Sequence, residues 1–229
     1  MKTISCIIAA YNECPRISSV LDIVVPCQGI SEIIVIDDGS KDNTREIVGE
    51  YVKKFPNVKL IVHEKNKGKT MAVYSDIKAS TGDYIFLLDA DLVGLIVSNI
   101  TALIDPIQKG EADMSMSMRS NPKYVQWLGI EYISGERIFS RSIALEILGI
   151  LPHVRGFGLE PCINTYIIKY NCRIKVVFWK NVQNPWPAWK KYGFIAGIKK
   201  DIRMNRDILG TISLWEVFYQ NYKMIKLKV

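Results

Sequence analysis

Two carboxylates stand at the end of a short apolar run in this sequence. The stretch "GDYIFLLDADLV" (82–93) places Asp89 and Asp91 directly after apolar residues, with only Ala90 between them. In an extended chain, residues i and i+2 point the same way and lie roughly 6.6 Å apart, so both carboxylates can face one ligand. Neighbouring carboxylates repel each other unless a cation lies between them. Open sets of oxygen ligands suit Mg²⁺ or Mn²⁺, so the pair predicts a metal site that binds a diphosphate.

The two acids also have a structural interpretation, in which they end a strand and cap the next helix. A lone Asp-x-Asp is weak evidence for a metal site. In this sequence, however, Glu13, Asp38 and Lys69 also follow apolar runs. Several such residues on one edge favour a functional site over the structural alternative.

Short apolar runs alternate with helix-like segments in the first half of the chain. The runs are 3–9, 32–37, 58–63 and 84–88, and the helix-like segments are 15–24, 44–54 and 70–79. This alternation predicts a parallel sheet covered on both faces. Further strands are expected at 112–118 and 173–179, and further helices at about 136–148 and after "RGFGLE" (155–160). The predicted fold class is α/β, with a mostly parallel central sheet flanked by helices.

Polar residues follow each of the first four predicted strands. The stretches are "AYNE" (10–13), "DDGSKDNT" (37–44), "EKNKGKT" (64–70) and "DADL" (89–92). In open α/β sheets, ligands bind outside the carboxyl ends of the strands. The four loops therefore predict one binding edge that includes the acid pair.

Composition favours a globular protein of a reducing compartment. Hydrophobic residues make up 48% of the 229 residues, and the five cysteines show no metal-ligand spacing. We expect neither a disulfide framework nor a zinc site. The start of the chain does not resemble a signal peptide, and the longest apolar candidate, 92–104, is too short to span a bilayer. We therefore expect a cytoplasmic protein without a transmembrane helix.

Positive charge is concentrated at the end of the chain. Residues 169–229 contain 13 Lys/Arg and 3 Asp/Glu, whereas residues 1–168 contain 17 and 20. We expect a catalytic domain over 1–183 and a basic, aromatic, helical appendage over 184–229. A basic and aromatic segment suggests an anionic partner surface, either lipid or nucleic acid.

The appendage is expected to contact an anionic membrane peripherally. Residues 184–209 place aromatic and branched apolar side chains among lysines and arginines, and helical spacing gathers Ile195, Ile198 and Ile202 on one face. Such a pattern suits the lipid headgroup zone. Alternatively, the aromatics pack on the catalytic domain. Nucleic acid is not expected as a partner, because no nucleic-acid-binding motif is visible.

The chain resembles the family 2 glycosyltransferases, which have the GT-A nucleotide-diphospho-sugar transferase fold. The resemblance rests on "ISCIIAAYNE", "IIVIDDGSKDNT", "NKGKTMAVYSDIKASTGDYIFLLDADL" and, less specifically, "SGERIFSRSIALEI". Together these stretches cover about residues 4–147. Polyprenyl-phosphate and dolichyl-phosphate sugar synthases are the most similar members in character.

The resemblance implies roles for individual residues on the donor side. Donor-binding residues would be Ala10, Tyr11, Glu13, Asp38, Lys69 and Asp89. Asp89 and Asp91 would hold Mg²⁺ or Mn²⁺, with Asp91 the firmer ligand and also part of the catalytic set. Some family members have a polar residue two positions later, where this chain has Val93, so a third protein ligand is in doubt.

The acceptor side offers two arginines and one acid. Arg137 and Arg141 are spaced i, i+4, which would put them on one helix face, and guanidinium groups suit a phosphate acceptor. They could equally be ordinary surface residues. The resemblance makes Glu160 the general base that deprotonates an acceptor hydroxyl, whereas a structural alternative is an acid that stabilises a helix N-terminus.

The sequence therefore predicts a metal-dependent inverting glycosyltransferase. It would use a UDP- or GDP-sugar and a lipid-linked acceptor, at the inner face of the cell membrane. Alternatives are a transferase for a soluble saccharide or phosphorylated metabolite, and a degenerate protein that only binds nucleotide sugar or membrane. A dinucleotide-dependent oxidoreductase is disfavoured, because no GxGxxG follows the first strand.

Overall fold

A computed structural model describes residues 1–119, 130, 132–154, 156–183 and 206–229. The strands are β1 (Ile4–Ala10), β2 (Glu32–Asp37), β3 (Val58–Val62), β4 (Tyr84–Leu87), β5 (Met114–Arg119), β6 (Arg137–Ser140) and β7 (Ile174–Trp179). The helices are α1 (Ile17–Val24), α2 (Thr44–Lys54), α3 (Lys69–Ala79), α4 (Val97–Gln108), α6 (Arg141–Ile147), α7 (Leu159–Lys169) and α10 (Leu214–Lys226). Two short 3₁₀ turns, η1 (Leu151–His153) and η2 (Gly156–Gly158), precede α7.

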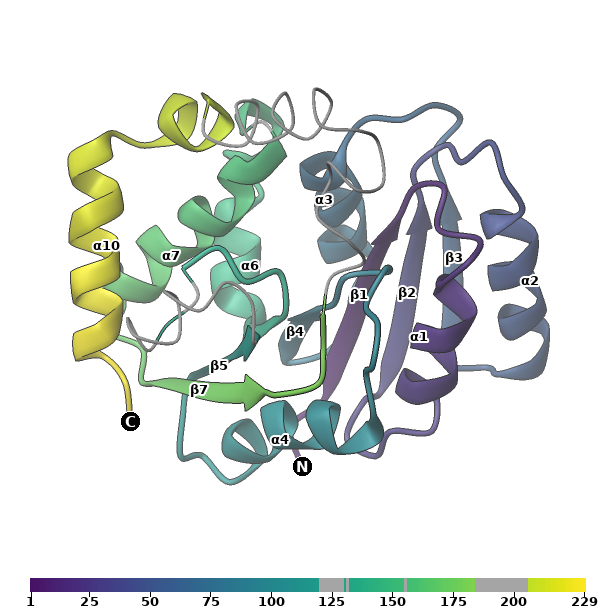
Figure 1. Ribbon diagram of the computed structural model, residues 1–229, viewed down its shortest axis with the longest axis horizontal. Coiled ribbons are helices and arrows are strands. Elements are labelled where there is room, and N and C mark those ends of the chain that lie inside the picture. Colours follow the sequence, from purple (N-terminus) through teal and green to yellow (C-terminus); the bar gives the residue numbers. More distant parts are fainter. Residues whose placement is uncertain (120–129, 131, 155, 184–205) are drawn as a thin grey trace.

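All seven strands form one sheet in the order β3-β2-β1-β4-β6-β5-β7 (Figure 1). Strands β1 to β4 are parallel, β6 is antiparallel to both β4 and β5, and β7 is parallel to β5. The strand order reverses between β1 and β4, because β2 and β3 extend from one side of β1 and the later strands from the other. Such a switch point is where α/β sheets bind ligands.

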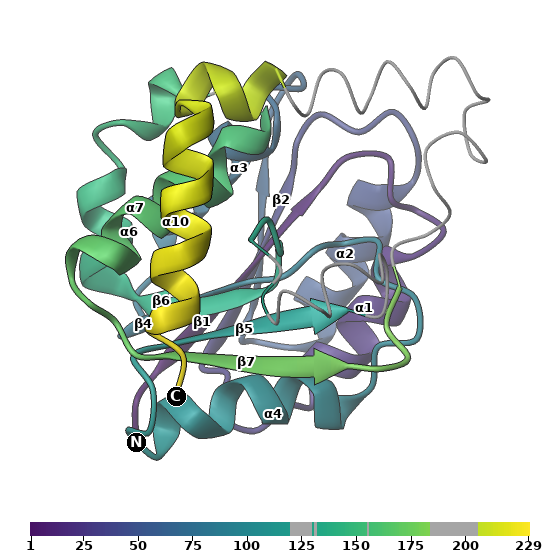
Figure 2. The same cartoon turned by 60° about the vertical axis from the view of Figure 1, so that its left-hand side comes forward.

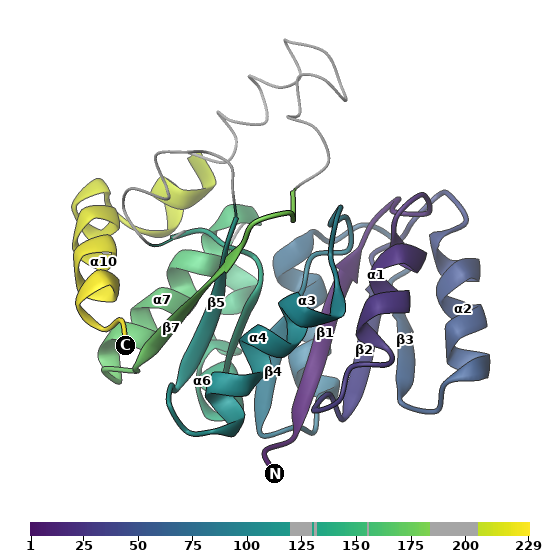
Figure 3. The ribbon, with the colours of Figure 1, turned by 60° about the horizontal axis from the view of Figure 1, so that its bottom comes forward.

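Helices cover both faces of the sheet (Figure 3). One apolar core lies between the sheet and helices α1, α2 and α4, and the other between the sheet and helices α3, α6 and α7. Every residue of β2 is buried, including its two acids Glu32 and Asp37. A central strand covered on both faces has no solvent side, which explains its nearly continuous apolar sequence. The expected α/β class with a mostly parallel sheet is confirmed.

The segment around residue 140 differs from its predicted structure. We expected one helix over about 136–148, but residues Arg137–Ser140 form β6 and the helix α6 begins only at Arg141. The strand forms because Ile138 and Phe139 are fully buried between β4 and β5. Ser140 then caps α6 by accepting a hydrogen bond from the backbone N–H of Ile143.

The last helix, α10, lies along α7 at the β7 side of the molecule (Figure 2). Gln220 donates hydrogen bonds from α10 to the Pro161 carbonyl and the Thr165 hydroxyl on α7. At the other end, the backbone of Ile174 accepts and donates hydrogen bonds with the residues that follow α10. Most of the stretch 184–209 that is predicted to contact a membrane, residues 184–205, lies outside the described residues. Within the described part, no helix is long and apolar enough to cross a bilayer.

Candidate active site

A cavity of about 360 Å³ opens at the carboxyl ends of β1 and β4, at the switch point of the sheet. Its volume falls within the range of small-molecule sites. Small side chains leave the space open, and polar ones border it. The lining residues are Ala9, Ala10, Tyr11, Glu13, Asp38, Asn66, Lys69, Ala72, Asp89, Ala90 and Asp91. The structure thus brings together all the residues expected from the sequence to bind the donor and the metal.

Asp89 lies where β4 ends and is held between two neighbours. One carboxylate oxygen accepts a hydrogen bond from Lys69 Nζ at 2.9 Å, and the other side of the group packs on Gly135. A Cβ atom at Gly135 would lie 2.6 Å from Asp89 Oδ2, so any larger residue there would displace the Asp89 carboxylate. Burial opposes the ionisation of Asp89, but the cations of Lys69 and Arg119 hold its pKa below its usual range. The carboxylate is therefore charged at neutral pH.

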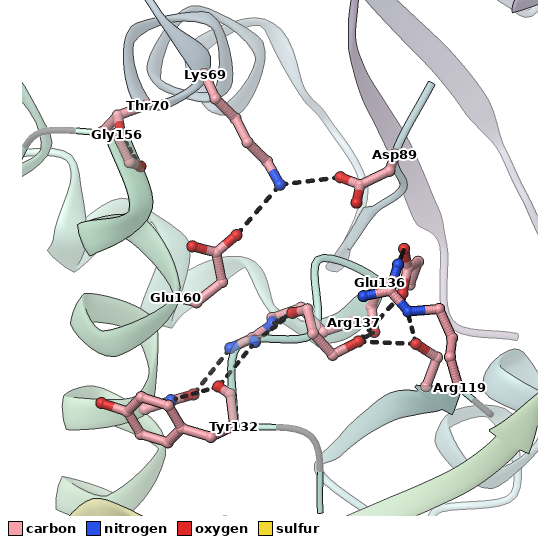
Figure 4. Close-up of polar contacts among 12 residues, drawn as sticks. Lys69, Thr70, Asp89, Arg119, Tyr132, Glu136, Arg137, Gly156 and Glu160 are labelled. Carbon is pink, nitrogen blue, oxygen red and sulfur yellow. Dashed lines mark hydrogen bonds and ion pairs between the residues drawn. The ribbon is translucent and has the colours of Figure 1, made fainter. Parts of the chain in front are cut away.

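Lys69 joins two carboxylates from opposite sides of the site (Figure 4). It is the first residue of α3, and its Nζ lies 2.9 Å from Asp89 Oδ1 and 3.2 Å from Glu160 Oε1. Burial alone would lower the pKa of Lys69, but the two carboxylates raise it above its usual value. The ammonium is therefore permanently charged and bridges β4 and α7.

Glu160 occupies the first turn of α7, where a negative charge is favoured by the helix dipole. Its side chain is only 5% exposed, and Oε2 has no hydrogen-bond partner among the described residues. A buried carboxylate oxygen without a donor costs free energy, so its presence calls for an explanation, and a catalytic role is one. Glu160 is not among the cavity-lining residues and reaches the cavity through Lys69.

Asp38 borders the cavity and fixes the loop that precedes α3. Its carboxylate accepts hydrogen bonds from the backbone N–H groups of Lys67 and Gly68, and it contacts His63 Nδ1 at 2.7 Å. The loop approaches so closely that a Cβ atom at Gly39, which has a φ of +74°, would lie 2.6 Å from the Lys65 carbonyl carbon. Asp38 therefore holds the cavity wall in place, in addition to its predicted role as a donor contact.

The loop after β1 is tied to the loop after β2. Asn12 accepts a hydrogen bond from the Lys41 N–H, and the Glu13 N–H donates to Thr44 Oγ1. Glu13 also pairs with Arg16 at 3.1 Å. These contacts leave Tyr11 at the cavity mouth with 41% of its surface exposed, where its ring can meet a planar ligand.

A buried polar cluster lies behind Asp89 and was not predicted from the sequence. Glu136 is fully buried and accepts hydrogen bonds from Ser117, Ser134 and Arg119 (Figure 4). A signal for Arg119 was available, because it ends β5, which runs in the same direction as β4, and so must lie at the same edge. Asn66 was also missed, although it opens the "NKGK" stretch and lines the cavity.

Neither of the two arginines expected to bind the acceptor lines the cavity. Arg137 is fully buried in β6 and donates to the Ser134 carbonyl and to Asn164 Oδ1. Arg141 begins α6 at the amino end of β4, because Ser140 pairs with Tyr84, the first residue of that strand. At roughly 3.4 Å per residue, this places Arg141 about 10 Å or more from the cavity edge. The prediction that the two arginines share a helix face is wrong, because Arg137 belongs to a strand.

The acids at the end of β4 fit a divalent cation held partly by substrate. No group of three or more His, Cys, Asp or Glu side chains with metal-binding geometry occurs among the described residues. The chain thus offers Asp89 and Asp91, which both line the cavity, while Val93 is apolar. Mg²⁺ and Mn²⁺ are commonly bound through one or two carboxylates, with phosphates and water completing the set.

Solved structures share the fold over nearly the whole chain. Glucosyl-3-phosphoglycerate synthase from Mycobacterium tuberculosis, in complex with Mn²⁺, UDP-glucose and phosphoglyceric acid, matches 92% of this chain and 79% of its own. The TM-score is 0.69 and the sequence identity 20%. A complex of the same enzyme with Mn²⁺ and UDP-glucose gives a TM-score of 0.70 at 21% identity. At this identity, the likeness establishes the fold.

Curated relatives match over shorter stretches. A dolichyl-phosphate beta-glucosyltransferase of Trichomonas vaginalis is 42% identical over 94 residues, covering 37% of this chain and 28% of the relative. An uncharacterized glycosyltransferase of Escherichia coli (strain K12) is 30% identical over 160 residues, covering 70% of this chain and 35% of the relative. The chain therefore spans only about a third of the length of these relatives.

The model of the family described as "Glycosyl transferase family 2" matches residues 5–157. This range contains all but the first residue of β1, the strands β2 to β6, the cavity, the acid pair that follows β4, and Lys69. The range ends three residues before Glu160. The family match therefore covers the cavity but does not reach α7. Because the match extends over more than half of the sequence, the chain belongs to glycosyl transferase family 2.

Proposed function

We propose that this protein transfers a sugar from a nucleotide-diphosphate sugar, either a UDP- or a GDP-sugar, to an acceptor, with the help of Mg²⁺ or Mn²⁺. The observation that carries this proposal is the cavity at the switch point, where Asp89, Asp91 and Lys69 meet. Two acids for a cation and one lysine suit the diphosphate of such a donor.

In this proposal the donor lies along the cavity from β2 to β4. Its base and ribose contact Ala10, Tyr11, Glu13 and Asp38, and its diphosphate lies against Lys69 and the acid pair of β4. Tyr11 offers a partly exposed ring for stacking on the base. Small residues such as Ala72 and Ala90 leave room for the sugar.

Charge neutralisation drives departure of the nucleotide diphosphate. When bound by Asp89 and Asp91, a divalent cation supplies Lewis-acid stabilisation of the leaving diphosphate. Lys69 adds a second, fixed positive charge next to the acid pair. The acceptor oxygen attacks the anomeric carbon from the face opposite the diphosphate, which inverts the configuration.

Glu160 is the proposed general base for a hydroxyl acceptor. Its buried Oε2 has no donor among the described residues and is available to take the acceptor proton, while Oε1 stays paired with Lys69. A phosphate acceptor is already ionised and needs no base, so Glu160 would then orient it.

The acceptor we favour is lipid-linked. Matches to dolichyl-phosphate beta-glucosyltransferases support this choice, as does the basic and aromatic composition of residues 184–209. Such an enzyme would work on the cytoplasmic face of the cell membrane as a peripheral protein. Its acceptor is met at the bilayer surface, which explains why cations and aromatics gather in one part of the chain.

A soluble phosphorylated acceptor is the second candidate, because a polar cavity of about 250 Å³ lies beside the turn before Glu160. His153, Arg206, Asp207 and Thr211 are among its lining residues. An arginine and a histidine suit an anionic group of a small acceptor.

A transfer screen tests the proposal and separates the two acceptors. Purified protein is incubated with UDP-, GDP- or dTDP-sugars and Mn²⁺ or Mg²⁺, with polyprenyl phosphate or with small sugar and glycerate phosphates as acceptor. We expect metal-dependent product with one donor and the lipid acceptor. Product only with a soluble phosphate establishes the second candidate, and Arg206→Gln should then lower its yield. No nucleotide release with any donor would contradict the proposal.

A further inference from the structure

The outward face of α10 is aromatic where a surface helix is normally polar. Trp215 is 83% exposed, and the exposed fractions of Phe218, Tyr219 and Tyr222 lie between 48% and 61%. Their spacing of i, i+3, i+4 and i+7 places them in one stripe along the helix. Such a continuous patch of exposed aromatic surface marks an interaction site.

The inward face of the same helix is narrow and packs against the rest of the protein. Met224 and Gln220 are buried against α7 and the sheet, and Gln220 makes hydrogen bonds there. At 100° per residue, Trp215 and Met224 point in opposite directions. The aromatic stripe therefore does not belong to the protein core, and no described residue covers it.

Lysines accompany the aromatic rings. Lys223 Nζ lies 5.6 Å from the centroid of the Tyr219 ring, and Lys226 Nζ lies 5.7 Å from that of Tyr222. The only acid in α10 is Glu216, in its first turn. The face therefore combines exposed aromatic rings with positive charge, a combination suited to an anionic, partly apolar surface.

We propose that the aromatic face of α10 docks on the headgroup layer of an anionic lipid bilayer. Trp, Tyr and Phe interspersed with Lys suit the zone where acyl chains meet charged headgroups. A second copy of the chain fits less well, because interface cores are depleted of lysine and like charges would face each other. This deepens the proposed function, on which it rests, by naming a docking element separate from residues 184–205.

The position of α10 lets the bilayer lie beside the catalytic edge. The residues after α10 pair with Ile174 at the start of β7, at the amino edge of the sheet. The helix then runs about 20 Å at 1.5 Å per residue, so its first turn, which contains Trp215, lies toward the edge where α7 begins. Figure 1 shows the start of α10 at the same end of the molecule as the start of α7. An acceptor whose lipid remains in the bilayer would thus be held on the same side as the proposed base.

The experiment compares flotation of full-length variants with lipid vesicles. Vesicles consist of phosphatidylcholine alone or with about a third phosphatidylglycerol, since anionic lipid attracts basic surfaces. The test variant is Trp215→Ser with Phe218→Ser, and both side chains are mostly exposed, so we expect the variant to keep the fold. The matched control is Val52→Ser with Val62→Ser, which removes two exposed apolar side chains from α2 and β3 at the other end of the sheet.

We expect the wild type and the control to float with the anionic vesicles. The affinity of the test variant for these vesicles should be lower by about tenfold or more, since binding scales with buried apolar area. Donor-induced thermal stabilisation without vesicles should be equal in all three. The proposal is overturned if the wild type stays at the bottom of the gradient or the test variant floats equally well. It is also overturned if light scattering shows that the wild type is a dimer and the test variant is a monomer. If the wild type floats but binds no donor, the docking proposal stands and the proposed sugar transfer is contradicted.

Discussion

Replacing Lys69 by methionine should destabilise the protein through the two carboxylates that Lys69 joins. Met keeps most of the side-chain volume and removes the charge. Glu160 is 5% exposed and Asp89 23%, so both would remain as partly or fully buried acids without their shared cation. Breaking a buried ion pair costs about 3 to 5 kcal/mol, and breaking a surface pair at most about 1 kcal/mol.

The size of the effect should lie between these limits. Because Lys69 itself is 37% exposed, water screens part of the interaction, and we expect a loss of about 1 to 3 kcal/mol in the free energy of unfolding. For a chain of this length, this corresponds to a fall in Tm of about 3 to 10 °C. Mn²⁺ should stabilise Lys69→Met more than it stabilises the wild type, since a cation among the carboxylates replaces the lost ammonium.

Lys59→Met is the matched control, measured with the same urea and thermal unfolding assays. Lys59 pairs with the buried Glu32 at 2.7 Å, far from the cavity, and Glu32 keeps hydrogen bonds from Ser5 and Thr81. This control should lose at most about 1 kcal/mol and gain nothing specific from Mn²⁺. The reasoning would be refuted if Lys69→Met were as stable as the wild type. It would also be refuted if Mn²⁺ stabilised the wild type, Lys69→Met and Lys59→Met equally.

Three further predictions concern single acids. Asp38→Asn should weaken donor binding by about 1 to 3 kcal/mol, because the charge that holds the N–H groups of Lys67 and Gly68 is lost; an unchanged calorimetric Kd would contradict this. Glu160→Gln should lower kcat by roughly 10² to 10⁴ with a hydroxyl acceptor while the donor Kd stays constant, and normal turnover would exclude a base. Asp76 is fully buried, neither oxygen has a partner among the described residues, and burial raises its pKa. The folded state therefore binds its proton more tightly than the unfolded state, so its contribution to stability is present at low pH and is lost as the pH rises. Asp76→Asn should raise the free energy of unfolding by about 1 to 3 kcal/mol near pH 8 and much less near pH 4; an equal effect at both pH values would contradict the linkage.

The parallel half of the fold was predictable because its signals are local. The first four strands were expected at 3–9, 32–37, 58–63 and 84–88, and they form within one residue of those bounds. Strand ends at one edge follow from parallel pairing alone, and this is enough to gather the cavity residues. The predicted roles of these residues depend on ligand contacts and stay predictions.

The antiparallel half was less predictable because its signals are long-range. Local propensity in "ERIFSRSIALEI" favours helix throughout, but pairing with β4 and β5 converts its first part into β6. Ser140 was a usable sign of the true helix start, since serine is a favoured N-cap. Helix α4 was missed because its apolar sequence was weighed only as a membrane span. The buried position of Arg137 depends on that same pairing and could not be read from spacing.

Calorimetric titration of the donor with and without Mn²⁺ tests the central claim most directly. UDP- and GDP-sugars are titrated into the wild type, into Asp91→Asn and into the control Asp105→Asn. Asp105 lies on α4, and its exposed carboxylate pairs weakly with Lys109. We expect one donor to bind the wild type and the control in Mn²⁺, and to bind about tenfold weaker or not at all in EDTA or to Asp91→Asn. Equal affinity in EDTA, or full affinity of Asp91→Asn, would contradict a metal-held diphosphate at the end of β4.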